Sequence, residues 1–182
     1  NGVGYHAYPD NVIREFIREA ARSGIDIFRI FDSFNNPESM RLAIETVKEM
    51  GKVAEVSFCY TDNILAPKYE KYSLDYYLQL EAMGADILCI KDMGGLLRPL
   101  AAKKLVTELR QVTDLPIHLH THDTSGNQIP ALMMAADAGL VELHEPIVAV
   151  AGTGHGADTA VVIRPAPTAE FLDSKVDRII CM

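Results

Sequence analysis

The sequence has little cysteine, no excess of basic charge and no long apolar run, and each shortage excludes a class of protein. Its 3 cysteines, Cys59, Cys89 and Cys181, form no CxxC pair, which argues against a disulfide framework or a zinc ribbon and favours a cytoplasmic location. The 17 Lys and Arg residues are outnumbered by 25 Asp and Glu residues, so we expect no nucleic-acid partner. Because no apolar run approaches the roughly 18 residues of a membrane helix and the N-terminus lacks a signal-peptide pattern, we expect neither membrane association nor export.

What the 182 residues do contain is a repeated unit: a helix with apolar residues every three or four positions, a glycine, and a short β-branched run. Asp10 is predicted to cap the first helix, and further helices are predicted to begin at Pro37, Ser73, Pro99 and Ile129. The glycines that suit the helix stops are Gly24, Gly51, Gly84 and Gly139. Strands are predicted to begin near Asp26, Val53, Asp86, Pro116 and Leu140. The repeat has the size of a βα unit and predicts an α/β fold.

The strand runs are apolar on both faces, which is typical of parallel strands covered by helices. Polar residues gather where four successive strands end, as at the active rim of a barrel, whereas an open doubly wound sheet uses chiefly its switch point. A complete eight-unit barrel needs about 250 residues, so we predict a partial TIM (β/α)8 barrel with its site at the carboxyl ends of the strands. Residues 1–139 would form its central part. Residues 140–182 form a divergent segment, because Gly and Pro clusters interrupt both periodicities there.

Three histidines alternate along one predicted strand and therefore share one face of it: His118, His120 and His122. Neighbouring imidazoles at a strand end can converge on a metal ion, and two of the three would suffice. Asp123 could orient such a site from the turn. The alternative is that these histidines only pack and form hydrogen bonds.

Lys91 ends the apolar run before it, and a lysine directed into a barrel mouth must be paired, modified or functional. A salt bridge to Asp32 or Asp123 is the simplest interpretation. A Schiff-base lysine is a second, and a lysine carboxylated by carbon dioxide is a third. An ammonium has no lone pair for a metal, whereas a carbamate offers oxygen ligands, so the histidines on the next strand favour the carbamate.

Six segments together form a recognisable combination: NGVGYHAYPDNV, DIFRIFDSFN, EVSFCYTDNIL, KYSLDYYLQL, ILCIKDMGGLLRP and LPIHLHTHDTSGNQ. They are similar to the carboxyltransferase domain of pyruvate carboxylases, and to the related oxaloacetate decarboxylase α chains and transcarboxylase subunits. The similarity runs from Asn1 to about Gly139. It implies a metal-centred TIM barrel that transfers a carboxyl group from carboxybiotin to pyruvate, forming oxaloacetate.

By the same resemblance, Lys91 would be the carboxylated catalytic lysine, and Lys91, His120 and His122 would bind a divalent metal such as Zn, Mn or Co. His118 would be a supporting neighbour. Biotin would arrive on a carrier domain outside this sequence, loaded by a biotin carboxylase domain, and the whole protein would be a homo-oligomer.

Other functional residues implied by the resemblance have no match in this sequence. They are a metal-binding Asp, the Arg and Gln residues that hold pyruvate, and a proton-shuttling Thr in an MSGxTSQP loop. We therefore expect the chain to be incomplete on its own. Two alternatives remain: another metal-dependent TIM-barrel lyase or aldolase acting on a keto acid, and a non-catalytic remnant.

Overall fold

The computed structural model describes residues 6–61, 63–140, 148–151, 159–163 and 179–182. Within these residues helices and strands alternate as far as α5, and strands follow. The elements are α1 (Asp10–Arg22), β1 (Ile27–Ile30), α2 (Pro37–Glu49), β2 (Val53–Cys59), α3 (Pro67–Ala82), β3 (Ile87–Asp92), α4 (Pro99–Val112), β4 (Ile117–Thr121), α5 (Gln128–Leu140), β5 (Val148–Ala151), β6 (Thr159–Ile163) and β7 (Ile179–Cys181).

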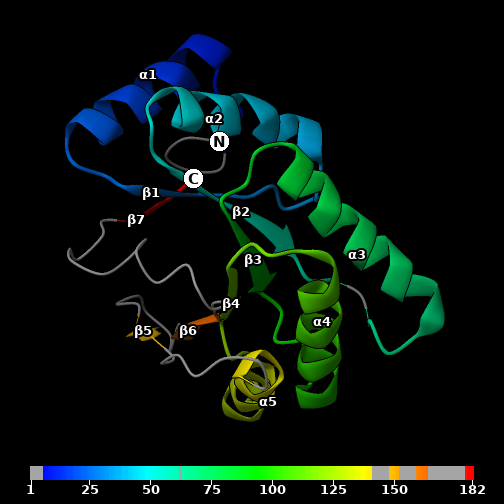
Figure 1. Ribbon diagram of the computed structural model, residues 1–182. Coiled ribbons are helices and arrows are strands. Elements are labelled where there is room, and N and C mark those ends of the chain that lie inside the picture. Colours follow the sequence, from blue (N-terminus) through cyan, green and yellow to red (C-terminus); the bar gives the residue numbers. More distant parts are fainter. Residues whose placement is uncertain (1–5, 62, 141–147, 152–158, 164–178) are drawn as a thin grey trace.

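The first four strands lie side by side in chain order and are all parallel, in a sheet of order β5-β6-β4-β3-β2-β1-β7. Helices α1 to α5 follow one another along one side of this sheet (Figure 1). Consecutive parallel strands joined by helices on one side are the arrangement of a TIM barrel, whereas an open doubly wound sheet has helices on both faces. The prediction of a partial barrel is confirmed.

Strand alternation separates an apolar outer face from a polar inner face. Residues such as Phe28, Val56, Phe58, Leu88 and Leu119 are fully buried in the core cluster that includes the helices. Their neighbours along the strands lie on the opposite face and include the charged or polar residues Arg29, Glu55, Lys91, His118 and His120, all of them buried. The helices therefore pack against the apolar outer face of the sheet, and the charged and polar side chains lie on its inner face.

Local signals explain most helix boundaries. Asn36 caps α2 by accepting a hydrogen bond from the Glu38 amide at 3.2 Å, with Pro37 in the first turn. Two details of the prediction are wrong. Asp10 is the first helical residue of α1 and does not cap it, and α3 begins at Pro67, six residues before Ser73.

The sheet departs from a regular barrel beyond β4. Leu140, near which a strand was predicted to begin, is the last residue of α5, and residues 141–147 lie outside the described part of the chain. On the side of β4 away from β3, the paired strand is β6, which runs antiparallel to β4 with Ile117 opposite Ile163. An uncovered strand edge presents unpaired amides and carbonyls, which β6 satisfies here. A parallel fifth barrel strand does not occupy this edge among the described residues.

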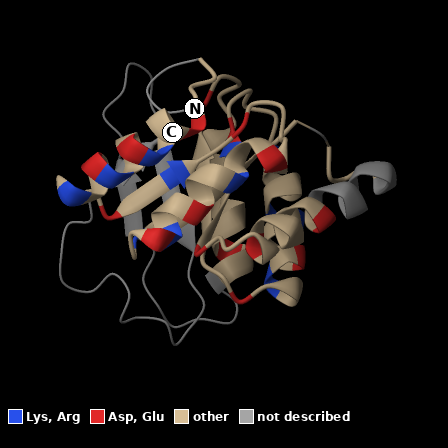
Figure 2. Ribbon diagram, turned by 90° about the horizontal axis from the view of Figure 1, so that it is seen from above, with Lys and Arg blue, Asp and Glu red and all other residues tan. Residues whose placement is uncertain are grey.

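Charged residues of both signs are interspersed along the helices (Figure 2). Several form exposed ion pairs, among them Arg41 with Glu38 and Lys103 with Asp137. Such surface pairs contribute little to stability. In the part of the chain that the structure describes, no helix combines the length and apolar character needed to cross a membrane.

Candidate metal site at the carboxyl ends of the strands

The structure brings Lys91, His120 and His122 together. Lys91 on β3 and His120 on β4 are register partners, so their side chains lie next to each other on the inner face of the sheet. His122 follows the end of β4 by one residue, and its ring centroid lies 4.9 Å from that of His120. The sequence expectation that these three residues meet at the carboxyl ends of adjacent parallel strands agrees with this geometry.

Lys91 is buried, with 6% of its surface exposed, and its Nζ lies 4.6 Å from the centre of the Phe31 ring. Among the described residues, no carboxylate lies within ion-pair distance of this amine. Asp32 accepts hydrogen bonds from amides of its own loop, and Asp123 accepts one from the first turn of α5. The salt bridges to Asp32 or Asp123 are therefore not formed, and the lysine is left for another role.

His120 has the properties of a metal ligand. Burial, together with the smaller effects of the positive charges of Lys91 and Arg29, lowers its pKa to about 3. The ring is therefore neutral at pH 7 and keeps a lone pair. Its Nε2 atom is buried and has no hydrogen-bond partner within the described structure. Buried polar atoms are rarely left unpaired, so this atom fits a site built to hold a cation.

Below these residues, on the same inner face, lies a buried ionic cluster that the sequence analysis did not identify. Arg29 Nε donates to Glu55 Oε1 at 2.5 Å, and His118 Nδ1 lies 2.7 Å from the same oxygen, to which its N–H donates. Burial alone would raise the pKa of Glu55, but the hydrogen bond from His118 and the charges of His118 and Arg29 outweigh it and lower the pKa to about 2. Glu55 is thus ionised.

The ionic cluster could have been found from the sequence. Arg29 and Glu55 each interrupt an otherwise apolar strand, and a charged residue within such a run must be paired. What the sequence did not indicate was their register, in which Arg29 lies directly opposite Glu55.

Glu55, Cys89 and His118 also bring three potential ligand atoms within 4.8 Å of one another. The Arg29 guanidinium already contacts two of these groups, with its Nη2 3.1 Å from His118 Nδ1. Burial also raises the pKa of the Cys89 thiol far above its usual range, so the sulfur stays protonated. Binding a metal cation next to a fixed guanidinium and a neutral thiol is unfavourable. Glu55, His118 and Arg29 therefore form a buried ionic cluster beside the candidate metal site and are not themselves a metal site.

The loops after β3 and β4 hold each other in place at the mouth of the site. Asp92 accepts hydrogen bonds from the amides of Leu96 and Leu97 at 2.9 and 3.0 Å, which fixes the loop that follows Lys91. Ser125 Oγ donates to the Gly95 carbonyl at 2.6 Å and joins this loop to the one that follows His122. The two loops therefore position the strand ends as a unit.

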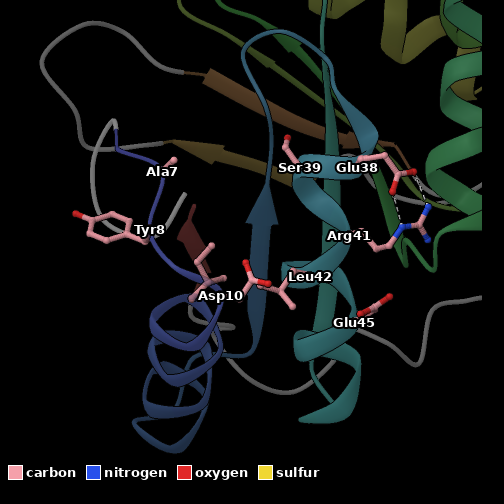
Figure 3. A pocket seen from close by; sticks show the side chains of 9 residues that line it. Ala7, Tyr8, Asp10, Glu38, Ser39, Arg41, Leu42 and Glu45 are labelled. Carbon is pink, nitrogen blue, oxygen red and sulfur yellow. Dashed lines mark hydrogen bonds and ion pairs between the residues drawn. The ribbon is translucent and has the colours of Figure 1, made fainter.

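Two of the surface pockets that the described residues line lie near helix and strand ends. One, of about 450 Å³, is formed by the loops after β2, β3 and β4. Its lining residues are Thr61, Asn63, Gly94, Gly95, Leu96, Arg98, Ser125 and Asn127. The other, of about 360 Å³, lies between the start of α1 and the first half of α2, where Arg41 pairs with Glu38 (Figure 3). Arg41 and Glu38 satisfy each other there, and none of the residues that line this pocket lies at a strand end.

Comparison with known proteins gives the same picture. Residues 18–169 match the family described as HMGL-like. The chain is 53% identical over 156 residues to the pyruvate carboxylase of Bacillus subtilis and 50% identical over 157 residues to that of Staphylococcus aureus. Each match covers 84% of this chain, which spans only 14% of the length of these relatives.

Solved structures agree. The chain resembles the carboxyl transferase domain of Rhizobium etli pyruvate carboxylase with pyruvate, at a TM-score of 0.73 and 48% identity. The same domain with pyruvate and biocytin gives a TM-score of 0.72 at 47% identity. Each match covers 76% of this chain and 24% of the solved chain. The resemblance inferred from the sequence motifs is confirmed.

Proposed function

Because this chain belongs to the HMGL-like family, we propose that it is part of a biotin-dependent carboxyltransferase that moves a carboxyl group from carboxybiotin to pyruvate, forming oxaloacetate. The observation that carries the proposal is the pairing of buried Lys91 with His120 on neighbouring strands. The lyase or aldolase alternative receives no support from relatives named as pyruvate carboxylases at about half identity.

In the proposed site, Lys91, His120 and His122 hold a divalent metal, with Zn, Mn and Co as candidates. Lys91 would first become a carbamate: the lone pair of the neutral amine attacks the carbon of carbon dioxide, a C–N bond forms as one C=O π bond becomes a C–O⁻ bond, and nitrogen gives one proton to water. The product is an anion with two oxygen ligands. His120 contributes the lone pair that its low pKa keeps available. Asp92 and Ser125 keep both strand ends in place through the joined loops.

The bound metal would supply Lewis-acid polarisation of the carbonyl oxygen of a keto acid. The chain itself contributes a water-poor inner face, since Lys91 and His120 are 6% and 8% exposed. Electrostatic interactions are stronger in such surroundings than in water. Biotin would come on a carrier domain, and a biotin carboxylase domain would load it. Both would be contributed by parts of the whole protein outside the 182 residues.

The experiment that tests this function is a chimera. The matched segment of the Bacillus subtilis relative is replaced by the corresponding residues of this chain, and ATP-dependent formation of oxaloacetate from pyruvate is measured. We expect the chimera to carboxylate pyruvate, and Lys91→Ala within it to lower the rate by more than about 100-fold, because a metal ligand is lost. Lys103→Ala, an exposed lysine on α4, is the matched control. Unchanged turnover in the Lys91 variant would overturn the proposed role.

Three further expectations stay predictions: a domain boundary between residues 139 and 140, a cytoplasmic location and a homo-oligomeric whole protein. Cys59 and Cys89 are buried and form no disulfide bond, which fits a reducing compartment.

A further inference from the structure

We propose that Phe31 is a positioning residue for Lys91: its ring holds the side chain as an ammonium ion, and so sets how much carbon dioxide is needed to convert Lys91 into the metal-binding carbamate. This inference rests on the proposed function, because it concerns the carboxylation of the lysine that would bind the metal. Phe31 is not itself proposed as a ligand. It acts on the site through Lys91.

The ring of Phe31 lies over the lysine amine. Phe31 directly follows the last residue of β1, and Lys91 Nζ lies 4.6 Å from the centre of its ring. An ammonium group within about 6 Å of an aromatic centroid is attracted by the negative face of the ring. Because only 6% of the Lys91 surface is exposed, water compensates little of its charge. The attraction is therefore stronger here than it would be between exposed side chains.

The neighbours of Lys91 within the sheet are uncharged. Cys59 of β2 and His120 of β4 are its register partners on either side. Burial raises the pKa of the Cys59 thiol to about 11, so the sulfur stays protonated at pH 7, and the ring of His120 is neutral. No carboxylate of the described residues pairs with the lysine amine. Among these neighbours, the ring of Phe31 is the group that attracts a positive charge.

The loop that begins with Phe31 is fixed against the end of β2. Asn35 Nδ2 donates to the Cys59 carbonyl, and Asn35 Oδ1 accepts from the Cys59 amide, both at 2.8 Å. Asn35 is buried and has a φ of 52°, a left-handed conformation in which asparagine is enriched. Asp32 accepts two further hydrogen bonds from amides of the same loop. These bonds hold Phe31 in place beside Lys91.

Carboxylation reverses the charge that the ring faces. The ammonium of Lys91 takes up one carbon dioxide: a C–N bond forms, one C=O π bond becomes a C–O⁻ bond, two N–H bonds break, and both protons go to water. The product is an anion, which the negative face of the Phe31 ring repels. The ring therefore favours the unmodified lysine, and the carbamate is expected to turn away from it towards His120, the register partner of Lys91.

The prediction is sharpest for Phe31→Leu, which removes the aromatic face but keeps an apolar side chain. We expect the bicarbonate concentration that half-saturates Lys91 to fall by about 2–30-fold, the range that corresponds to the usual strength of a cation–π interaction. Phe31→Tyr keeps the aromatic face, so its half-saturating concentration should stay within about twofold of that of the parent chain. Phe34→Leu is the matched control, because Phe34 lies in the same loop and is 93% exposed.

The experiment is a titration of the metal-free 182-residue chain with ¹³C-labelled bicarbonate at one fixed pH, in which NMR follows the carbamate carbon. The parent is compared with Phe31→Leu, Phe31→Tyr, Phe34→Leu and Lys91→Ala. The signal that is missing from Lys91→Ala identifies the carbamate of Lys91 among those of other amines. Circular dichroism shows whether each variant is folded. If the signal of Lys91 needs a bound metal, the same comparison is made with Zn²⁺ present.

A lower half-saturating concentration in Phe31→Leu, with Phe31→Tyr and Phe34→Leu like the parent, supports the proposal. An equal or higher concentration in Phe31→Leu overturns it, and so does the same shift in Phe31→Tyr, which would indicate a role in packing alone. If Phe31→Leu does not fold, Phe31→Met, which also lacks a ring, decides by the same criteria. Absence of the Lys91 carbamate from every protein, with and without Zn²⁺, overturns the proposed metal site itself, so the two failures are distinguishable.

Discussion

Lys91 is the residue whose chemistry most constrains what this chain does. It places an amine at the end of an apolar strand without a carboxylate partner among the described residues, next to a neutral histidine. We predict that Lys91→Ala lowers the metal content of the chain, measured by elemental analysis after incubation with Co²⁺ and bicarbonate, because an anionic ligand is removed. Lys103→Ala should leave it unchanged. Equal metal content in both variants would contradict a metal-binding role for Lys91.

Glu55 makes a second prediction, on acid stability. Its pKa is about 2 in the folded chain against 4.5 ordinarily, so its stabilisation is fully present above pH 4.5 and is lost as the pH falls towards 2. That shift corresponds to on the order of 3 kcal/mol. Glu55→Gln should therefore lower the free energy of unfolding at pH 7 by about this amount and by much less at pH 2.

Urea unfolding of the parent and variant at several pH values measures this difference. Exposed Glu45→Gln serves as the control, because the other acidic groups titrate alike in all three proteins. A loss of stability that is independent of pH would show that the Glu55 charge does not stabilise the fold.

At the scale of elements, the contact between the loops after β3 and β4 can be tested with a pair of glycines. Gly95 and Gly51 have the same φ of 63°, so alanine is strained by about 1–2 kcal/mol at either position. A Cβ at Gly51 would meet nothing within 4 Å, whereas at Gly95 it would lie 2.8 Å from the Ser125 amide nitrogen. We predict that Gly95→Ala destabilises the chain by at least about 1 kcal/mol more than Gly51→Ala.

Thermal unfolding of the two variants measures the difference. Gly95→Ala should also weaken Co²⁺ binding, because the loop it displaces directly follows the end of β3, where Lys91 lies. Gly51→Ala should leave Co²⁺ binding unchanged. Equal destabilisation by both substitutions would mean that the loops do not support each other.

Element boundaries depended on signals of unequal strength. The start of α2 was predictable because Asn36 and Pro37 combine a cap with a first-turn proline. The start of α3 was missed because Pro67 to Tyr72 carries no regular apolar stripe, so the periodicity becomes visible only after Ser73. Proline at the first helical position was the available signal.

For the whole molecule, the proposed reaction requires more than these residues, because the chain spans 14% of the length of its pyruvate carboxylase relatives. We predict that a polypeptide of these 182 residues forms no oxaloacetate from pyruvate, bicarbonate and ATP, even with Co²⁺ and free biotin. Catalysis needs reactants held in a near-attack geometry, and neither the carrier nor the loading domain is supplied. The chimera described above is the positive control. Comparable turnover by both proteins would contradict this prediction.

By itself, the sequence determined the parallel βα repeat, the inner face of each strand and the meeting of Lys91 with His120 and His122. These follow from local periodicity and from the fact that parallel strands end at the same edge of a sheet. Only the tertiary structure decided that Glu55 neutralises Arg29 and accepts from His118, and that β6 pairs antiparallel with β4. Such pairings join residues from distant segments, and their register is set by how whole strands and helices pack, which no local pattern encodes.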